Sequence, residues 1–243
     1  AAMPMVEALA MPFASGAAVC QSESILNLLC KGVRVLDFRV GMHDGEIHIC
    51  HTVVCDLLLS DALTQVAEFL RSKPSEVVIL LVKRDWEHKD FDTEENWATL
   101  QATAMSILDD LLVTDESEMA EPLQELVRRG RRALLLTEQP QDMEVFAGVR
   151  SASRLETSWL PSTKSVEDML RVCSQWRDSG RMRPERAKLK MLEVALPGAP
   201  SSSASGAQRA FREFMADLPL AICVNLDFPD EETIRAILGK NWQ

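Results

Sequence analysis

The chain has 243 residues, 47% of them hydrophobic, which is enough to bury one large core. Its 37 acidic and 26 basic side chains give a formal net charge of −11, which argues against nucleic-acid binding and against purely electrostatic docking on anionic membranes. No apolar run reaches the roughly 20 residues of a membrane-spanning helix. We therefore expect a soluble protein without a transmembrane segment.

The N-terminus and the cysteines bear on the cellular location. The opening Ala1-Ala2-Met3-Pro4 lacks the charged and apolar regions of a signal peptide, which favours a processed or trimmed start. The 6 cysteines show no paired C-x-x-C spacing. Buried free thiols are the favoured interpretation over disulfides, and they point to a reducing compartment, although the sequence identifies no specific one.

Short β-rich runs alternate with amphipathic helices along the chain, which predicts an α/β fold with a parallel sheet wrapped by helices. The expected strands are residues 33–40, 46–52, 76–83, 132–137, 188–196 and 220–228. The expected helices are residues 24–31, 60–74, 93–112, 118–129, 165–176, 208–217 and 230–238, with caps at Ser60 and Thr93. Residues 197–206 are low in complexity and are expected to form a mobile loop inside the domain.

One segment carries a specific motif. Residues 32–40 read G-V-R-V-L-D-F-R-V, followed by Asp44-Gly45 and by Ile49-Cys50-His51. This order resembles the G-x-R-x-(L/F)-D-x-R…H region of the X domain of phosphatidylinositol-specific phospholipase C. Residues 69–79 are similar to the family's F-L-x-x-x-P-x-E-x-(V/I)-(I/L) segment, and residues 225–228 are similar to its closing strand. The resemblance implies a distorted TIM-like (β/α) barrel that forms a single domain over residues 1–243.

The resemblance also implies a reaction in which two histidines cleave a phosphodiester. One takes a proton from the inositol 2-hydroxyl, and the other protonates the diacylglycerol leaving oxygen. His51 matches the second histidine, the general acid, and Asp37 or another carboxylate would hold it in the donating form. Arg39 matches the arginine that replaces calcium in the bacterial, metal-independent members, where a guanidinium binds phosphate oxygens.

Two further positions complete the implied site. Lys83 stands where calcium-dependent members carry an acidic ligand and bacterial members carry a lysine. Because Arg39 and Lys83 put cations where calcium would need oxygen ligands, we expect no metal and no cofactor. Asp227 matches the aspartate that orients the first histidine. Glu138 follows the strand at 132–137, near where bacterial members keep a basic inositol contact.

The first catalytic histidine itself is missing. The family's (I/M)-P-G-T-H-(D/N)-S pattern corresponds to residues 11–17, where Ser15 replaces the base and Gly16 replaces the residue beside it. A serine hydroxyl does not accept a proton near neutral pH, and general base catalysis typically contributes about 100- to 10,000-fold. Two functions stay open: a phosphodiesterase acting on a phosphoinositide or related phosphodiester, and an inactive barrel that binds an inositol phosphate or serves as a protein partner.

Each site residue also has a purely structural alternative. Asp37 and Arg39 lie two apart on a strand and are able to form an ion pair. Lys83 is able to extend from a strand end to solvent, and Asp227 is able to cap the last helix. His48, Cys50, His51 and Cys55 suggest zinc, but strand alternation puts His48 and Cys50 on one face and His51 on the other, so we predict no zinc site.

Overall fold

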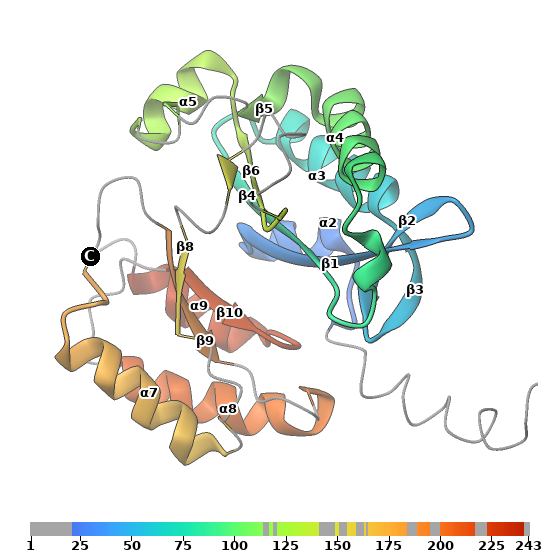
Figure 1. The fold of residues 1–243 in the computed structure, drawn as a ribbon. Helices are drawn as coiled ribbons and strands as arrows, with labels where there is room; N and C mark the ends of the chain where they lie inside the picture. Colours follow the sequence, from blue (N-terminus) through green and yellow to red (C-terminus); the bar gives the residue numbers. More distant parts are fainter. Residues whose placement is uncertain are drawn as a thin grey trace, which may run out of the picture. The chain divides into compact units, whose positions relative to one another are not determined.

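The structure is a computed structural model that describes residues 21–113, 117–118, 121–140, 149–150, 155–158, 163, 165–183, 189–194, 200–216 and 223–240. The chain divides into two compact units, one of residues 24–154 and one that combines residues 1–23 with residues 155–243. Both units place helices against parallel strands, so the α/β prediction is confirmed (Figure 1). A single domain over the whole chain stays a prediction.

The sheet of the first unit has the order β3-β2-β1-β4-β6-β5, with β7 paired to β6. The strands β1, β4 and β6 run parallel, whereas β2 pairs antiparallel with both β1 and β3. The strand bounds are Val35–His43 (β1), Glu46–His51 (β2), Val53–Leu58 (β3), Val78–Arg84 (β4), Leu112–Val113 (β5), Ala133–Thr137 (β6) and Val149–Arg150 (β7). The sequence did not predict β3, because the chain reverses at Thr52 without a glycine, proline or asparagine.

Helix ends in this unit follow the capping residues. Ser24 accepts a hydrogen bond from the Asn27 N–H, and Gly32 ends the helix with a φ of 110°. Thr93 caps its helix in the same way. The helices are Ile25–Lys31 (α2), Leu59–Ser72 (α3), Glu94–Leu108 (α4) and Leu123–Arg129 (α5), with 3₁₀ turns at Lys89–Phe91 (η1) and Asp109–Leu111 (η2). The expected cap at Ser60 is wrong, because α3 begins at Leu59 without a side-chain cap.

One face of the sheet packs on α3 and α4 to form the core. Leu36, Phe38 and Val40 of β1 and Leu80 and Val82 of β4 are buried in this core. Apolar side chains from the helices cover them, including Leu63, Val66, Leu70 and Trp97. Because side chains alternate along a strand, the residues between these positions lie on the opposite face of the sheet.

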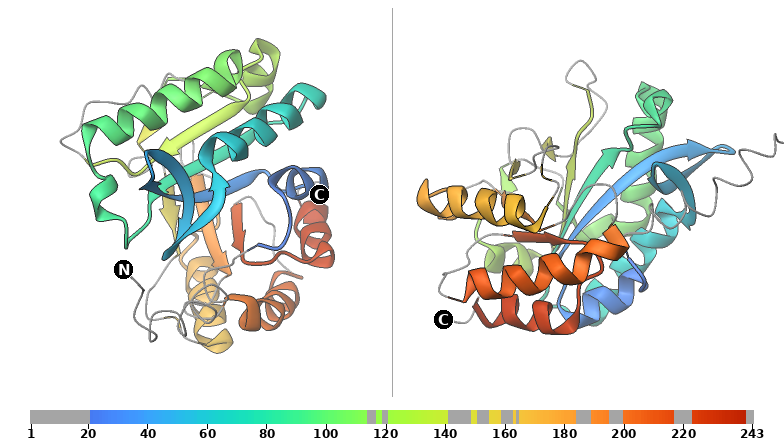
Figure 2. Two further views of the ribbon diagram at one scale, coloured as in Figure 1. Left: turned by 90° about the vertical axis from the view of Figure 1, so that its right-hand side faces the viewer. Right: turned by 90° about the horizontal axis from the view of Figure 1, so that it is seen from below.

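The second unit has a three-stranded parallel sheet in the order β10-β9-β8. Its strands are Leu155–Thr157 (β8), Leu189–Val194 (β9) and Cys223–Leu226 (β10), and its helices are Val166–Asp178 (α7), Pro200–Met215 (α8) and Glu231–Lys240 (α9). The helices α7 and α8 contact each other and β9 (Figure 2). Across the described residues, no helix combines the length and apolarity needed to cross a membrane.

Helix α8 corrects the expectation of a mobile loop at residues 197–206. Residues 200–206 are helical, and residues 197–199 lie outside the described part of the chain. Proline is well suited to the first turn of a helix. The small side chains of Ala204 and Ala207 are buried on one helix face with Phe211. Tertiary packing of this face therefore outweighs the loop-like composition.

Candidate functional site

Three predicted site residues lie on the neighbouring strands β1 and β4, two of them in the first five residues of β1 and one near the end of β4. Asp37 and Arg39 alternate with the core residues of β1, so both lie on the face that is turned away from α3 and α4. Lys83 pairs in register with Arg39 across the parallel β1–β4 ladder. Register partners share a face, so the two cations and Asp37 form one polar group on the sheet.

The charges in this group are paired. The Lys83 Nζ donates to Asp37 Oδ2 at 3.3 Å and lies 3.5 Å from Glu138 Oε1. The Arg39 Nε lies 3.5 Å from Asp37 Oδ1. The Lys83 side chain is 8% exposed and the Arg39 side chain is 40% exposed. Arg39 is therefore the cation that an anion from solvent would reach first, and the ion pair offered as the structural alternative for Asp37 and Arg39 is present.

Buried polar atoms without a hydrogen-bond partner among the described residues occur on both faces of the sheet. They are Asp37 Oδ1, Thr137 Oγ1 and Gln139 Oε1, and Thr137 pairs in register with the core residue Val82, so its side chain lies on the face opposite to Asp37. Thr137 ends β6, and the Glu138 N–H donates to Val82 O of β4. Buried polar groups without partners are rare in folded proteins and often mark sites that take a ligand or water. The face of the sheet that carries Asp37 is the best candidate site among the described residues.

His51 is the last residue of β2, and its place beside the Arg39–Lys83 pair stays a prediction. The antiparallel β1–β2 ladder runs from His43↔Glu46 to Val40↔Ile49, so the two residues after Ile49 lead back along β1 toward Arg39. The His51 Nδ1 is buried and has no hydrogen-bond partner among the described residues. Asp37 is occupied by Lys83 and Arg39 instead, so its predicted role in orienting His51 stays a prediction.

Asp227 follows β10 in the second unit. The side-chain amide of Gln208, on α8, donates to Asp227 O at 2.8 Å and to Phe228 O at 2.9 Å. The cap of α9 is Asp230, which accepts the Thr233 N–H at 2.6 Å. Burial raises the pKa of Asp230, but hydrogen bonds from Thr233 and Arg212 outweigh it, so the pKa is lowered overall. The alternative role of Asp227 as the helix cap is thus taken by Asp230.

Ser15 and Gly16, the departed catalytic position, lie outside the described residues. Two further residues, His88 and Asp85, lie in the loop after β4, and the sequence did not single out Asp85. His88 packs on Gly41, where an added methyl group would lie 2.7 Å from its ring carbon Cγ. Asp85, only 1% exposed, binds backbone groups next to His51. The only sequence feature that could have pointed to Asp85 is its acidic side chain two positions after Lys83. Its hydrogen-bond partners are known only from the structure.

The residues considered for zinc bind backbone groups instead. The His48 Nδ1 lies 2.9 Å from Cys55 O, and the Cys50 thiol contacts His48 O. No group of three or more histidine, cysteine or acidic side chains arranged for a metal occurs within the described ranges. The cysteines of these ranges are free, with Cys50 and Cys173 buried.

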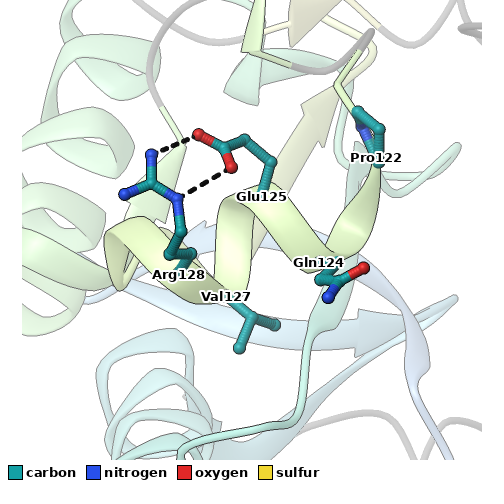
Figure 3. A pocket seen from close by; sticks show the side chains of 5 residues that line it. All are labelled: Pro122, Gln124, Glu125, Val127 and Arg128. Carbon is teal, nitrogen blue, oxygen red and sulfur yellow. Dashed lines mark hydrogen bonds and ion pairs between the residues drawn. The ribbon is translucent and has the colours of Figure 1, made fainter.

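A pocket of about 420 Å³ lies on α5 and differs from the strand-end site (Figure 3). It is lined by Pro122, Gln124, Glu125, Val127 and Arg128. The hydrogen bonds from Arg128 to the partly exposed Glu125 lower the carboxyl pKa to about 2, so the ionised carboxylate is already paired. None of the residues with candidate chemistry lines this pocket.

The family of the chain follows from comparison with known proteins. The family model of the PI-PLC X domain, described as PI-PLC X 1, matches residues 12–179. The human PI-PLC X domain-containing protein 1 is 29% identical over 171 residues, which cover 67% of this chain and 49% of the relative. An uncharacterized secreted protein of Arthroderma benhamiae is 29% identical over 123 residues, covering 47% of this chain and 26% of that protein. The chain thus spans about half or less of these relatives.

Solved structures agree on the fold. The phosphatidylinositol-specific phospholipase C from Listeria monocytogenes has a TM-score of 0.71 at 19% identity, covering 98% of this chain and 88% of that chain. A variant of the Staphylococcus aureus enzyme has a TM-score of 0.73 at 14% identity, covering 93% and 86%. The fold of this chain is therefore similar to that of these enzymes, which confirms the predicted TIM-like α/β fold. The chain belongs to the PI-PLC X-domain family of phosphatidylinositol-specific phospholipase C-like proteins.

Proposed function

We propose that this protein binds a phosphodiester of the phosphoinositide class on the Arg39–Lys83 face and cleaves it without a metal ion. The observation that supports this function most is the register pairing of Arg39 with Lys83 near the end of the parallel β1–β4 ladder. Two cations on one face suit a phosphate, and a guanidinium binds two of its oxygens at once. The family membership supplies the substrate class.

Asp37 would prepare both cations for this task. It holds Lys83 through Oδ2 and lies beside the Nε of Arg39 through Oδ1. The terminal guanidinium nitrogens of Arg39 are then the ones left for phosphate oxygens. Cations held in place before the ligand arrives stabilise developing negative charge without rearrangement during the reaction. Because both oxygens of Asp37 already face a cation, a calcium ion would have to displace the side chains of Arg39 and Lys83 to bind Asp37.

The proposed reaction transfers the phosphoryl group within the substrate. The inositol 2-hydroxyl attacks phosphorus, the bond from phosphorus to the diacylglycerol oxygen breaks, and His51 gives that oxygen a proton. The products are an inositol cyclic phosphate and diacylglycerol. The proton of the 2-hydroxyl needs an acceptor, and Asp227 acting through a water is the candidate that the sequence offers in place of Ser15.

The proposal is tested with purified protein and phosphatidylinositol vesicles in EDTA, with ³¹P NMR to detect the cyclic phosphate. We expect release by the unchanged protein and its loss in His51→Ala. The control is His43→Gln, since the His43 side chain is 55% exposed and contacts Asp44 and the His48 ring rather than Asp37, Arg39 or Lys83. Cyclic phosphate no more abundant than in the His51→Ala sample would refute cleavage.

A second candidate function is phosphate binding without turnover. Ser15 at the position of the family's base favours it, as does Glu138, which lies 3.5 Å from the Lys83 ammonium and would repel a phosphate. In this case inositol phosphates bind, the binding depends on Arg39, and the NMR assay stays silent. If inositol phosphates do not bind either, the remaining alternative is that this chain acts as a binding partner of another protein.

A further inference from the structure

The loop after β4 contains a buried carboxylate that reaches the residue next to His51. Asp85 is 1% exposed and follows Lys83 by two positions. Its Oδ2 accepts the Thr52 N–H at 3.1 Å, and its Oδ1 accepts the Glu87 N–H at 3.0 Å. Its own N–H donates to Val40 O at 2.9 Å, which fixes Asp85 against β1. The end of β4 is thereby tied to the turn between β2 and β3.

Thr52 needs this support because of its backbone conformation. Its φ is 68°, in the left-handed region, which is unfavourable for a β-branched residue. A second bond from the same loop reaches it, since the Trp86 Nε1–H donates to Thr52 Oγ1 at 3.3 Å. Strained conformations of this kind persist only where the surroundings hold them, and they are common at functional sites.

We infer that Asp85 is a positioning residue for His51, which acts by holding the Thr52 backbone in the conformation that orients the imidazole at the end of β2. This inference rests on the proposed role of His51. Asp85 acts through Thr52, because both of its carboxylate oxygens accept backbone N–H groups and the His51 Nδ1 has no partner among the described residues. The end of β4 would then supply both the phosphate-binding Lys83 and Asp85, which supports the general acid.

Asp85 also lies close enough to two cysteines to affect them. Burial, followed by the nearby Asp85, raises the pKa of the Cys50 thiol to about 12. The same carboxylate contributes to the raised pKa of Cys55, after burial and Asp56. The backbone N–H groups of Thr52 and Glu87 compensate this buried charge, as hydrogen bonds to a carboxylate generally do.

The first test compares the steady-state kinetics of Asp85→Asn with those of the unchanged protein. Asparagine keeps one acceptor but loses the charge and the second acceptor, so the Thr52 and Glu87 N–H groups cannot both be satisfied and the Thr52 turn is held less firmly. We expect kcat to fall by roughly 10- to 100-fold, as small misplacements of reacting groups cost, while KM stays within about twofold. The control Asp92→Asn removes the Arg84–Asp92 ion pair of the same loop without touching Thr52, and its kcat should stay near that of the unchanged protein.

A second-site variant separates positioning from direct chemistry. Glycine adopts positive φ freely, so Thr52→Gly in the Asp85→Asn background should restore several-fold of the lost kcat. No recovery would show that the carboxylate acts on the substrate or on His51 directly and would overturn the inference. If Asp85→Asn does not fold, the variant Trp86→Phe takes its place in the test. Trp86 is 59% exposed, and phenylalanine removes the hydrogen bond from its indole N–H to Thr52. A kcat of Trp86→Phe equal to that of the unchanged protein would count against the inference.

A readout without turnover keeps the two proposals apart. In imidazole-detected NMR of ¹³C-histidine protein, the His51 signals should shift in Asp85→Asn and move back in the double variant, while the exposed His43 stays unchanged. An inactive protein with these shifts would refute the proposed cleavage and retain the positioning role. Unchanged His51 signals in a folded Asp85→Asn protein would overturn the positioning role.

Discussion

Replacing Lys83 with methionine should destabilise the protein, because it leaves a buried carboxylate without its main partner. The side chains of Lys83 and Asp37 are 8% and 13% exposed. Breaking a buried ion pair on one side costs about 3–5 kcal/mol. Arg39 still lies 3.5 Å from the other Asp37 oxygen, so we expect a loss near the lower end, about 3 kcal/mol.

The assay is urea unfolding followed by circular dichroism. With a slope of about 1–3 kcal/mol per molar urea, the midpoint should fall by roughly 1 M or more. The double variant Lys83→Met with Asp37→Asn removes both charges and should recover most of the stability. Glu76→Gln is the control, since its pair with Arg34 is 30–38% exposed and should contribute about 1 kcal/mol or less. A Lys83→Met midpoint equal to that of Glu76→Gln, or losses that simply add in the double variant, would refute the buried-pair reasoning.

Three further predictions concern other parts of the described structure. The exposed Cys30 should react with a disulfide reagent at pH 8 far faster than Cys50, whose pKa of about 12 leaves about one thiolate in 10,000; equal labelling by mass spectrometry would contradict this. Asp230→Asn should cost about 1 kcal/mol at pH 7, because asparagine still caps the helix but loses the charge-assisted bonds from Arg212. Because the folded pKa of Asp230 is lowered, this cost should shrink as the pH falls below about 4, and a pH-independent cost in thermal unfolding would argue against it. Gly41→Ala should destabilise by about 1–3 kcal/mol through its clash with His88, and an unchanged melting temperature would show that the ring moves aside.

The fold could be predicted where its signals are local. Three helix starts, near Ser24, Thr93 and Ser165, were predicted correctly, and in the structure the hydroxyl of each residue accepts an N–H of its own first turn. The strand β3 was missed because Thr52 reverses the chain without a typical turn residue. The start of α8 was missed because small residues that suggest a loop bury a helix face once neighbouring elements are present.

The candidate site shows the same division. The motif predicted Asp37, Arg39, Lys83 and His51, and strand alternation with register pairing brings the first three together. The bond from Asp85 to Thr52 joins residues 33 positions apart, so no spacing rule in the sequence indicates it. The sequence drew attention to Glu138, but only the packing of β6 beside β4 shows that it pairs with Lys83.

The central claim is that the Arg39–Lys83 face binds phosphate without a metal, and one calorimetric titration tests it most directly. Inositol 1-phosphate is titrated in EDTA into the unchanged protein, Arg39→Ala and the Glu76→Gln control. We predict saturable binding to the unchanged protein and the control, and an affinity weaker by roughly 10- to 100-fold in Arg39→Ala, from the loss of charge-assisted hydrogen bonds. Equal affinities for the unchanged protein and Arg39→Ala, or binding that appears only when calcium is added, would contradict the claim.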